Sequence, residues 1–141
     1  MLADISERCS TIEECYEFML AYAAQGLPSD EGSRSGEQIR EYLARADKAI
    51  SGLVESCATA LKKELFEPAE PYQAFFAVLD RDAHDSLAAI KLVLAQRAIG
   101  SQMIDNLNAS IHFRALLTDL FLLSEIANTQ RRAAKPMASG G

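Results

Sequence analysis

Residues 101–128, SQMIDNLNASIHFRALLTDLFLLSEIAN, decide which fold this chain can form. Apolar residues recur in this stretch at steps of three and four, the spacing of one face of an α-helix. They form two stripes on opposite sides, Ile104, Leu107, Ile111, Ala115, Leu122 and Ile126 on one and Phe113, Leu116, Leu117 and Leu120 on the other. A helix that is apolar on both sides must be covered on both sides. We therefore expect one long helix, from Ser101 to Asn128, within a helical assembly.

The second stripe of this helix predicts a contact surface. A four-helix bundle covers one face of each helix, so the far side needs a further cover. Exposed apolar patches usually mark sites of contact with other proteins. We expect this surface to bind a second copy of the chain, as a homodimer, or another protein, through Phe113, Leu116, Leu117 and Leu120. The alternative is that the first helix of the same chain splits and wraps over it.

Three earlier segments have the same helical spacing. The first covers residues 5–23 and ends at Gly26 and Pro28, which do not continue a helix. The second begins at Ser35, which forms a capping box with Gln38. It continues to near Phe66 as the cleanest stripe in the chain, through Ile39, Leu43, Ala46, Ile50, Leu53, Cys57 and Leu61.

The third segment opens at Pro71, a favourable first position of a helix. Gly100 and Ser101 then offer a helix end and a new N-cap, which predicts a tight antiparallel hairpin with the fourth helix. The chain shows no strand-like alternation and no internal repeat. These patterns predict an all-α protein, a four-helix up-down-up-down bundle that forms a homodimer. Residues 1–128 form its single domain, and residues 129–141 a disordered basic tail.

Charge and hydropathy restrict the partners and the cellular location that we expect for the protein. The net charge is −6, and setting aside the three positive charges of Arg131, Arg132 and Lys135 leaves −9 for the remainder. Such an acidic body repels phosphate backbones, so we expect no nucleic-acid partner. The most apolar run, ALLTDLFLL, is too short to cross a bilayer. No basic and apolar leader opens the chain, so we expect a cytoplasmic protein without membrane contact.

The motifs of common enzyme classes are missing from the sequence. It contains no glycine-rich phosphate loop, no GxSxG and no HExxH, and its cysteines lie on apolar stripes. A ferritin-like metal site would need Glu-x-x-His pairs, which the chain lacks. We therefore expect no metal, no cofactor and no catalytic activity of these kinds.

The fourth helix also carries a narrow polar strip between its leucines, formed by Asp105, Asn108, His112 and Asp119. A histidine at a helix or subunit boundary that hydrogen-bonds a carboxylate fits this pattern. A contact that responds to pH through His112 is the sharper hypothesis.

The other histidine lies in HDSLAAIKL, residues 84–92. The helical wheel directs His84 away from the core stripe, with Asp85 beside it and Lys91 two turns further on. This string resembles the phosphoacceptor box of bacterial histidine kinases, but it lacks the polar residues that usually follow the first four. The resemblance implies that His84 accepts a phosphoryl group and that Asp85 assists, in a carrier without a kinase domain.

Two functions are compatible with these patterns. The first is a small non-catalytic interaction protein, an adaptor, chaperone-like or regulatory module that binds through its fourth helix. The second is a histidine phosphotransfer protein of a bacterial two-component phosphorelay that uses His84.

Overall fold

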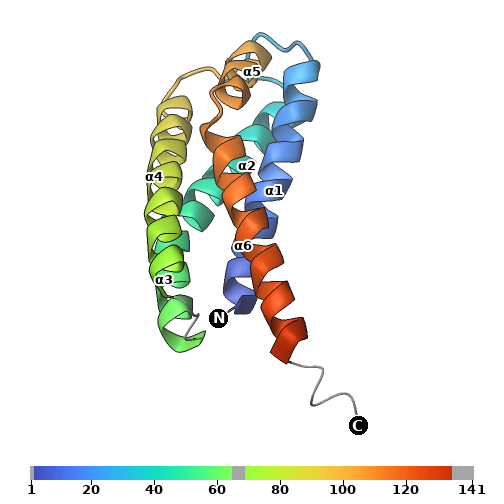
Figure 1. The fold of residues 1–141 in the computed structure, drawn as a ribbon. Helices are drawn as coiled ribbons and strands as arrows, with labels where there is room; N and C mark the ends of the chain where they lie inside the picture. The colour runs from blue at the N-terminus through green and yellow to red at the C-terminus, as the bar shows by residue number, and fades with distance from the viewer. Residues whose placement is uncertain (1, 65–68, 135–141) are drawn as a thin grey trace.

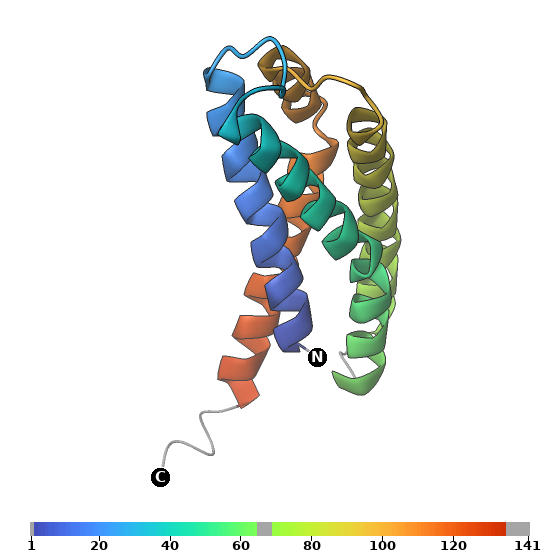
Figure 2. The same cartoon turned by 180° about the vertical axis from the view of Figure 1, so that it is seen from behind.

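The computed structural model describes residues 2–64 and 69–134 of the chain. These residues form helices and no strand, so the predicted all-α class is confirmed: α1 (Leu2–Ala24), α2 (Arg34–Ser51), α3 (Leu53–Glu64), α4 (Ala69–Leu94), α5 (Ser101–Ala109) and α6 (His112–Ala134). Figure 1 shows α1, α4 and α6 as three long upright helices, with α5 across the upper end. Figure 2 shows α2 crossing obliquely from α1 to α4, after which α3 continues downward beside α4.

The expected second helix is broken at Gly52, between α2 and α3. The Gly52 N–H donates to the carbonyl of Ile50 and ends α2. Arg8 of α1 donates from Nη1 to the carbonyl of Ala49 at 3.1 Å. A Cβ atom on Gly52 would lie 2.6 Å from the same Nη1. Glycine therefore allows the Arg8 guanidinium to reach the carboxyl end of α2, where a positive charge is favourable. The apolar stripe continues across the break, which is why periodicity alone predicts one helix.

The expected fourth helix is broken as well, at Ser110 and Ile111. The hydroxyl of Ser110 donates to the carbonyl of Leu107 at 2.6 Å, which ends α5. Ile111 then has a φ of 66°, a conformation that β-branched residues rarely adopt. This residue changes the direction of the chain, so α6 does not continue the axis or the side-chain positions of α5. Ile104 and Leu107 of the first stripe therefore form the inner face of α5, whereas the second stripe forms the inner face of α6.

The predicted contact surface is consequently part of the core of one chain. All four of its residues are buried: Phe113, Leu116, Leu117 and Leu120. Their cover comes from within the chain, as in the alternative expectation, but it is provided by α4 together with α1, and α1 is one unsplit helix. Ile111, from the other stripe, is instead 64% exposed. The expectation that these four side chains bind a partner is therefore wrong.

Several predicted boundaries also differ from the structure. Ser33, rather than Ser35, is the N-cap of α2, where its side chain accepts from the Gly36 N–H. The first residue of α4 is Ala69, before Pro71. Helix α6 reaches Ala134, so residues 129–134 of the expected tail are helical. Phe66 and the rest of the predicted tail, residues 135–141, lie outside the described residues.

The core joins the inner faces of all six helices. It includes Ile12, Cys15 and Met19 of α1, the α2–α3 stripe from Ile39 to Cys57, and Leu79, Ala83 and Ile90 of α4. Burial raises the pKa of the Cys15 thiol to about 12 and that of Cys57 to about 11. Both thiols therefore stay protonated and act as small apolar groups, not as nucleophiles.

One buried carboxylate ties the two upper loops to the helices. Asp30 accepts from Arg40 Nε at 2.5 Å and from the backbone N–H of Ile99 at 2.6 Å. The same guanidinium donates through Nη2 to the carbonyls of Gln96 and Arg97, at 2.9 and 3.1 Å. Arg40 thus binds the loop after α1 and the loop after α4 at the same time. These hydrogen bonds are charge-assisted, and the site is partly shielded from water. Hydrogen bonds of this kind are among the strongest in proteins.

Two hydroxyl groups complete this junction. Tyr22 donates to the carbonyl of Ile99 at 2.7 Å. Ser101 donates to the carbonyl of Tyr22 at 2.6 Å and accepts from the Leu27 N–H at 2.8 Å. Ser101 is therefore not the N-cap of α5; Gly100 takes that position without a side-chain bond. Residues 95–100 therefore form a linker that is hydrogen-bonded to α1 through Tyr22. The tight hairpin predicted between α4 and the next helix does not form.

We predict that Asp30→Asn lowers the free energy of unfolding by about 2 kcal/mol at pH 7, the range of hydrogen bonds to charged groups. The hydrogen bond from Arg40 holds the pKa of Asp30 below its ordinary value. Its stabilisation is therefore complete above the unfolded pKa and is lost as the pH falls through the lower folded value. Urea unfolding at several pH values tests this. The control Glu31→Gln removes the exposed charge of the next residue and should change little. Equal effects of both variants would contradict the prediction.

Candidate functional site

Polar side chains interrupt the apolar contact between α4 and α6. We call this contact the α4–α6 seam and define it by Asp82, Asp85 and Ser86 of α4 with His112 and Asp119 of α6. The two helices are antiparallel neighbours, as Figure 1 shows. Ser86 lies in the middle of the inner stripe of α4, one turn after Asp82, and is buried. The seam therefore places acidic groups and a hydroxyl where leucine and valine would pack without desolvation cost.

The innermost acidic group of the seam is Asp119. Its side chain is buried, and the neighbouring carboxyl group on α4 is that of Asp82. Two carboxyl groups can share a hydrogen bond only when one carries a proton. Burial, followed by the neighbouring carboxyl of Asp82, raises the pKa of Asp119 to about 7. Asp119 thus keeps its proton in mildly acidic solution and loses it around neutral pH.

Towards the upper end, the seam holds a second and weaker pair. His112 Nδ1 lies 3.9 Å from Asp85 Oδ2, and both side chains are nearly half exposed. At this distance and exposure a protonated histidine gains little from the carboxylate. The contact nevertheless directs Asp85 toward α6 and away from the neighbouring His84.

Three buried side-chain atoms among the described residues have no hydrogen-bond partner: Ser86 Oγ, Asn108 Oδ1 and Asp119 Oδ2. Two of them belong to the seam, and Asn108 lies one turn before His112 in the sequence. A buried polar atom without a partner costs free energy, so such a group indicates a function, a bound water or a stored strain. Of the predicted polar strip, Asn108, His112 and Asp119 thus have buried or half-buried side chains, whereas Asp105 is exposed.

His84 lies on the outer side of α4, separate from the seam. Its side chain is 71% exposed, and Nδ1 lies 2.8 Å from the Asp80 carbonyl oxygen and 3.2 Å from Asp80 Oδ1. Two acceptors at Nδ1 favour the tautomer that carries hydrogen there, which leaves the Nε2 lone pair for solvent. Lys91, two turns on, is paired with Asp47 of α2 at 3.0 Å. The orienting carboxylate is therefore Asp80, not the predicted Asp85.

Sequence reasoning missed Asp82, Asp30, Arg40 and Arg8. Asp82 had a detectable signal, because it lies one turn before Ser86, a polar residue inside an apolar stripe. Each of the others has at least one partner 40 or more positions away, for example Lys48 for Arg8. Periodicity contains no information about contacts at such separations.

Comparison of the chain with protein-family models, with curated proteins and with solved structures found no match. The described residues contain no group of three His, Cys, Asp or Glu side chains placed to hold a metal ion. Within the same part of the chain, no helix has the length and apolar character needed to cross a membrane.

We predict that Ser86→Ala raises the free energy of unfolding by about 1 kcal/mol, because it removes a buried hydroxyl that has no partner. The matched control is Ser101→Ala, which removes a buried hydroxyl with two hydrogen bonds and should cost about 1 to 2 kcal/mol. Denaturant unfolding of both variants measures the contrast. A destabilised Ser86→Ala protein would show instead that a buried water or another group binds this hydroxyl.

Proposed function

We propose that this chain is a non-catalytic helical module that works by protein–protein contact, and that it pairs with a second copy of itself along the outer edge of α4 and α6. The observation that carries the proposal is the exposure of Val78 and Leu122, at 43% and 48%. Large apolar side chains that stay exposed in a folded chain favour contact with another protein. The proposal retains the interaction through the last helix but moves it to a different face.

The two side chains lie at the same height of the bundle. Val78 precedes Asp82 by about one turn on α4, and Leu122 follows Asp119 by about one turn on α6. Because the helices are antiparallel and Asp82 contacts Asp119, Val78 and Leu122 flank the same level of the seam. Half-buried Phe75 and Ile126 extend this apolar edge by another turn. We call these four residues the apolar edge.

Charges beside the apolar edge favour a second copy as the partner. Arg81 of α4 and Glu125 of α6 are both exposed, one on each flank. A two-fold axis parallel to both helices would set α4 of one copy on α6 of the other. Arg81 would then approach the partner's Glu125 in both halves of the interface, as isologous contacts require. Only about 1 kcal/mol per half-exposed side chain is available, so we expect a weak, concentration-dependent dimer.

Leu122→Asp should make the protein monomeric at all concentrations, because it places a charge in the centre of the apolar edge. Sedimentation equilibrium over a wide concentration range measures the association. Leu92→Asp is the matched control, since Leu92 is 66% exposed on the outer side of α4 and outside the edge. Arg81→Glu should also weaken the dimer, and adding Glu125→Arg should restore it. A wild-type protein that stays monomeric, or equal effects of both leucine variants, would rule out this interface.

A second candidate function is phosphoryl transfer through His84, which the geometry at Nδ1 favours. With hydrogen held on Nδ1 by Asp80, Nε2 can attack the phosphorus of an acyl phosphate or phosphoramidate donor. The N–P bond forms as the donor's P–O or P–N bond breaks, and the released carboxylate or amine leaves. Small exposed neighbours, Ala77 and Ala88, leave room for the donor on this face of the helix.

Incubation with acetyl phosphate or phosphoramidate, followed by phosphorus NMR, should show one N–P signal that is stable in base and labile in acid. His84→Gln should abolish the signal, and His112→Gln should retain it. The absence of labelling, or labelling that persists in His84→Gln, would exclude this second function.

A further inference from the structure

The contact between Asp82 and Asp119 has an unusual requirement. The side chain of Asp119 is buried, its Oδ2 has no hydrogen-bond partner, and the carboxyl group that acts on it is that of Asp82 across the seam. No lysine, arginine or histidine among the described residues forms an ion pair with either aspartate. Two ionised carboxylates at this separation would repel each other in a site with little solvent. The contact is therefore attractive only while one proton is present.

The remaining charged groups near the seam do not replace this proton. On the two helices of the seam, the other titratable or charged side chains include Asp80, Arg81, His84, Asp85 and Lys91 of α4 and His112, Arg114 and Glu125 of α6. On the helices around them, such side chains include Cys9, Glu13, Tyr16 and Glu17 of α1, Asp47 of α2, which pairs with Lys91, Glu55 and Cys57 of α3, and Asp105 of α5. Among them, His84 points outward to Asp80 and His112 pairs weakly with Asp85. Burial and the Asp82 carboxyl alone account for the raised pKa of Asp119.

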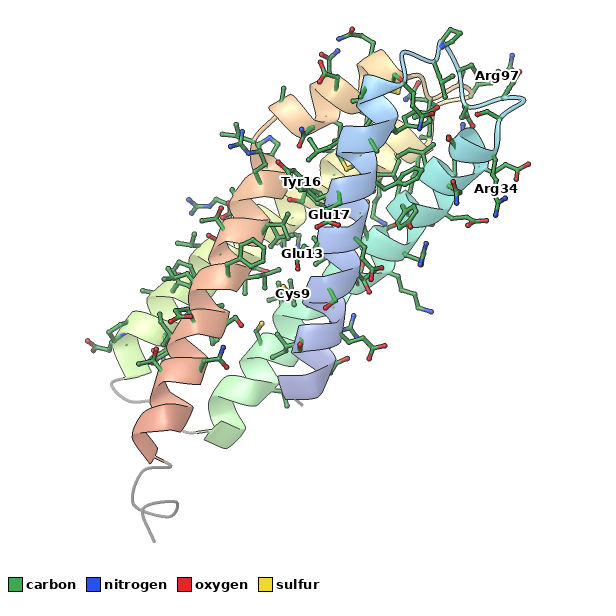
Figure 3. All side chains as sticks on the ribbon, turned by 90° about the vertical axis from the view of Figure 1, so that its right-hand side faces the viewer. Cys9, Glu13, Tyr16, Glu17, Arg34 and Arg97 are labelled. Atoms are coloured by element: carbon green, nitrogen blue, oxygen red, sulfur yellow. The ribbon has the colours of Figure 1, made fainter. Side chains whose placement is uncertain are left out.

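The seam is also the principal attachment of the lower half of α6. Helix α6 packs more extensively on α4 than on α1. Near its upper end α6 contacts α1, where Tyr16 stacks on Phe113 with ring centroids 6.1 Å apart. Figure 3 shows α1 and α6 as separate ribbons at the levels of Glu13 and Cys9. Beyond Leu120, the described side chains of α6 are exposed or half-buried. A loosened seam would therefore free the lower part of α6 and leave its upper part in place.

We propose that Asp82 and Asp119 form a proton-operated latch, in which one shared proton holds α6 on α4 and its loss releases the lower part of α6. This regulatory device goes beyond the proposed function and does not depend on dimer formation. In the closed state the pair binds a proton that the open state releases. The open state consequently becomes more populated as the pH rises from the ordinary carboxyl value toward neutrality, and the effect levels off above about pH 7.

Hydrogen exchange of the full chain, measured by mass spectrometry and corrected for intrinsic rates, tests the latch. Between pH 5 and pH 7, the opening equilibrium of residues 119–129 should rise roughly 50-fold, as linkage to one proton requires. Peptides from α2 should show no such change. In Asp119→Asn, the neutral amide can donate to Asp82 at any pH, so protection of α6 should no longer depend on pH.

Asp105→Asn is the matched control, because it removes an exposed carboxylate near the seam and should retain the wild-type response. Asp82→Asn provides a second latch variant, and carbon NMR of the wild-type aspartate carboxyl groups gives a test without substitution. The proposal would be overturned if the protection of α6 in the wild-type protein did not depend on pH, or if the pH response survived in Asp119→Asn and Asp82→Asn. Titration of Asp119 near pH 4 would overturn it as well. Restored protection on addition of Mg²⁺ or Ca²⁺ at pH 8 would also overturn it, since a cation would then be the natural occupant.

Discussion

The guanidinium of Arg40 is the contact on which the arrangement of the helices depends. It binds the carboxylate of Asp30 in one loop and the carbonyls of Gln96 and Arg97 in another. These loops join α1 to α2 and α4 to α5, so a single side chain determines how the first half of the chain meets the second. Gly36 belongs to the same constraint, because a Cβ atom there would overlap the backbone of Asp30.

Asp30 and Asp119 show how the surroundings of a carboxyl group determine its effect. Both are buried, but Asp30 faces an arginine and Asp119 faces another carboxyl group. The arginine favours the ionised form of Asp30, whereas the neighbouring carboxyl group favours the protonated form of Asp119. Their contributions to stability therefore change in opposite directions with pH. One end of the molecule is weakened by acid and the α4–α6 seam by base, which favours an optimum in mildly acidic solution.

The sequence was sufficient for the helical class, the inner faces of most helices and the outward direction of His84. It was insufficient for the two breaks, because an apolar stripe passes through Gly52 unchanged and because Ile111 is an improbable residue for positive φ. The second break converted one buried face into an apparent second stripe, which explains the mistaken contact surface. His112 and Asp119 of the polar strip were recognised, but their partners Asp85 and Asp82 belong to another helix. Local patterns identify polar positions and do not identify what those positions face.

The hydroxyl of Tyr22 has a consequence for how the protein is made. Its acceptor, the carbonyl of Ile99, lies 77 positions later in the chain, and Ser101 returns a bond to Tyr22 across 79 positions. On the ribosome, α1 and α2 emerge long before these partners, so Asp30 and Arg40 lack their hydrogen-bond partners in residues 96–99 at that stage. Contacts of such sequence separation also slow folding, since a long loop must close before they form. A nascent chain that stalls before residue 100 would expose an incomplete core and become a client for chaperones.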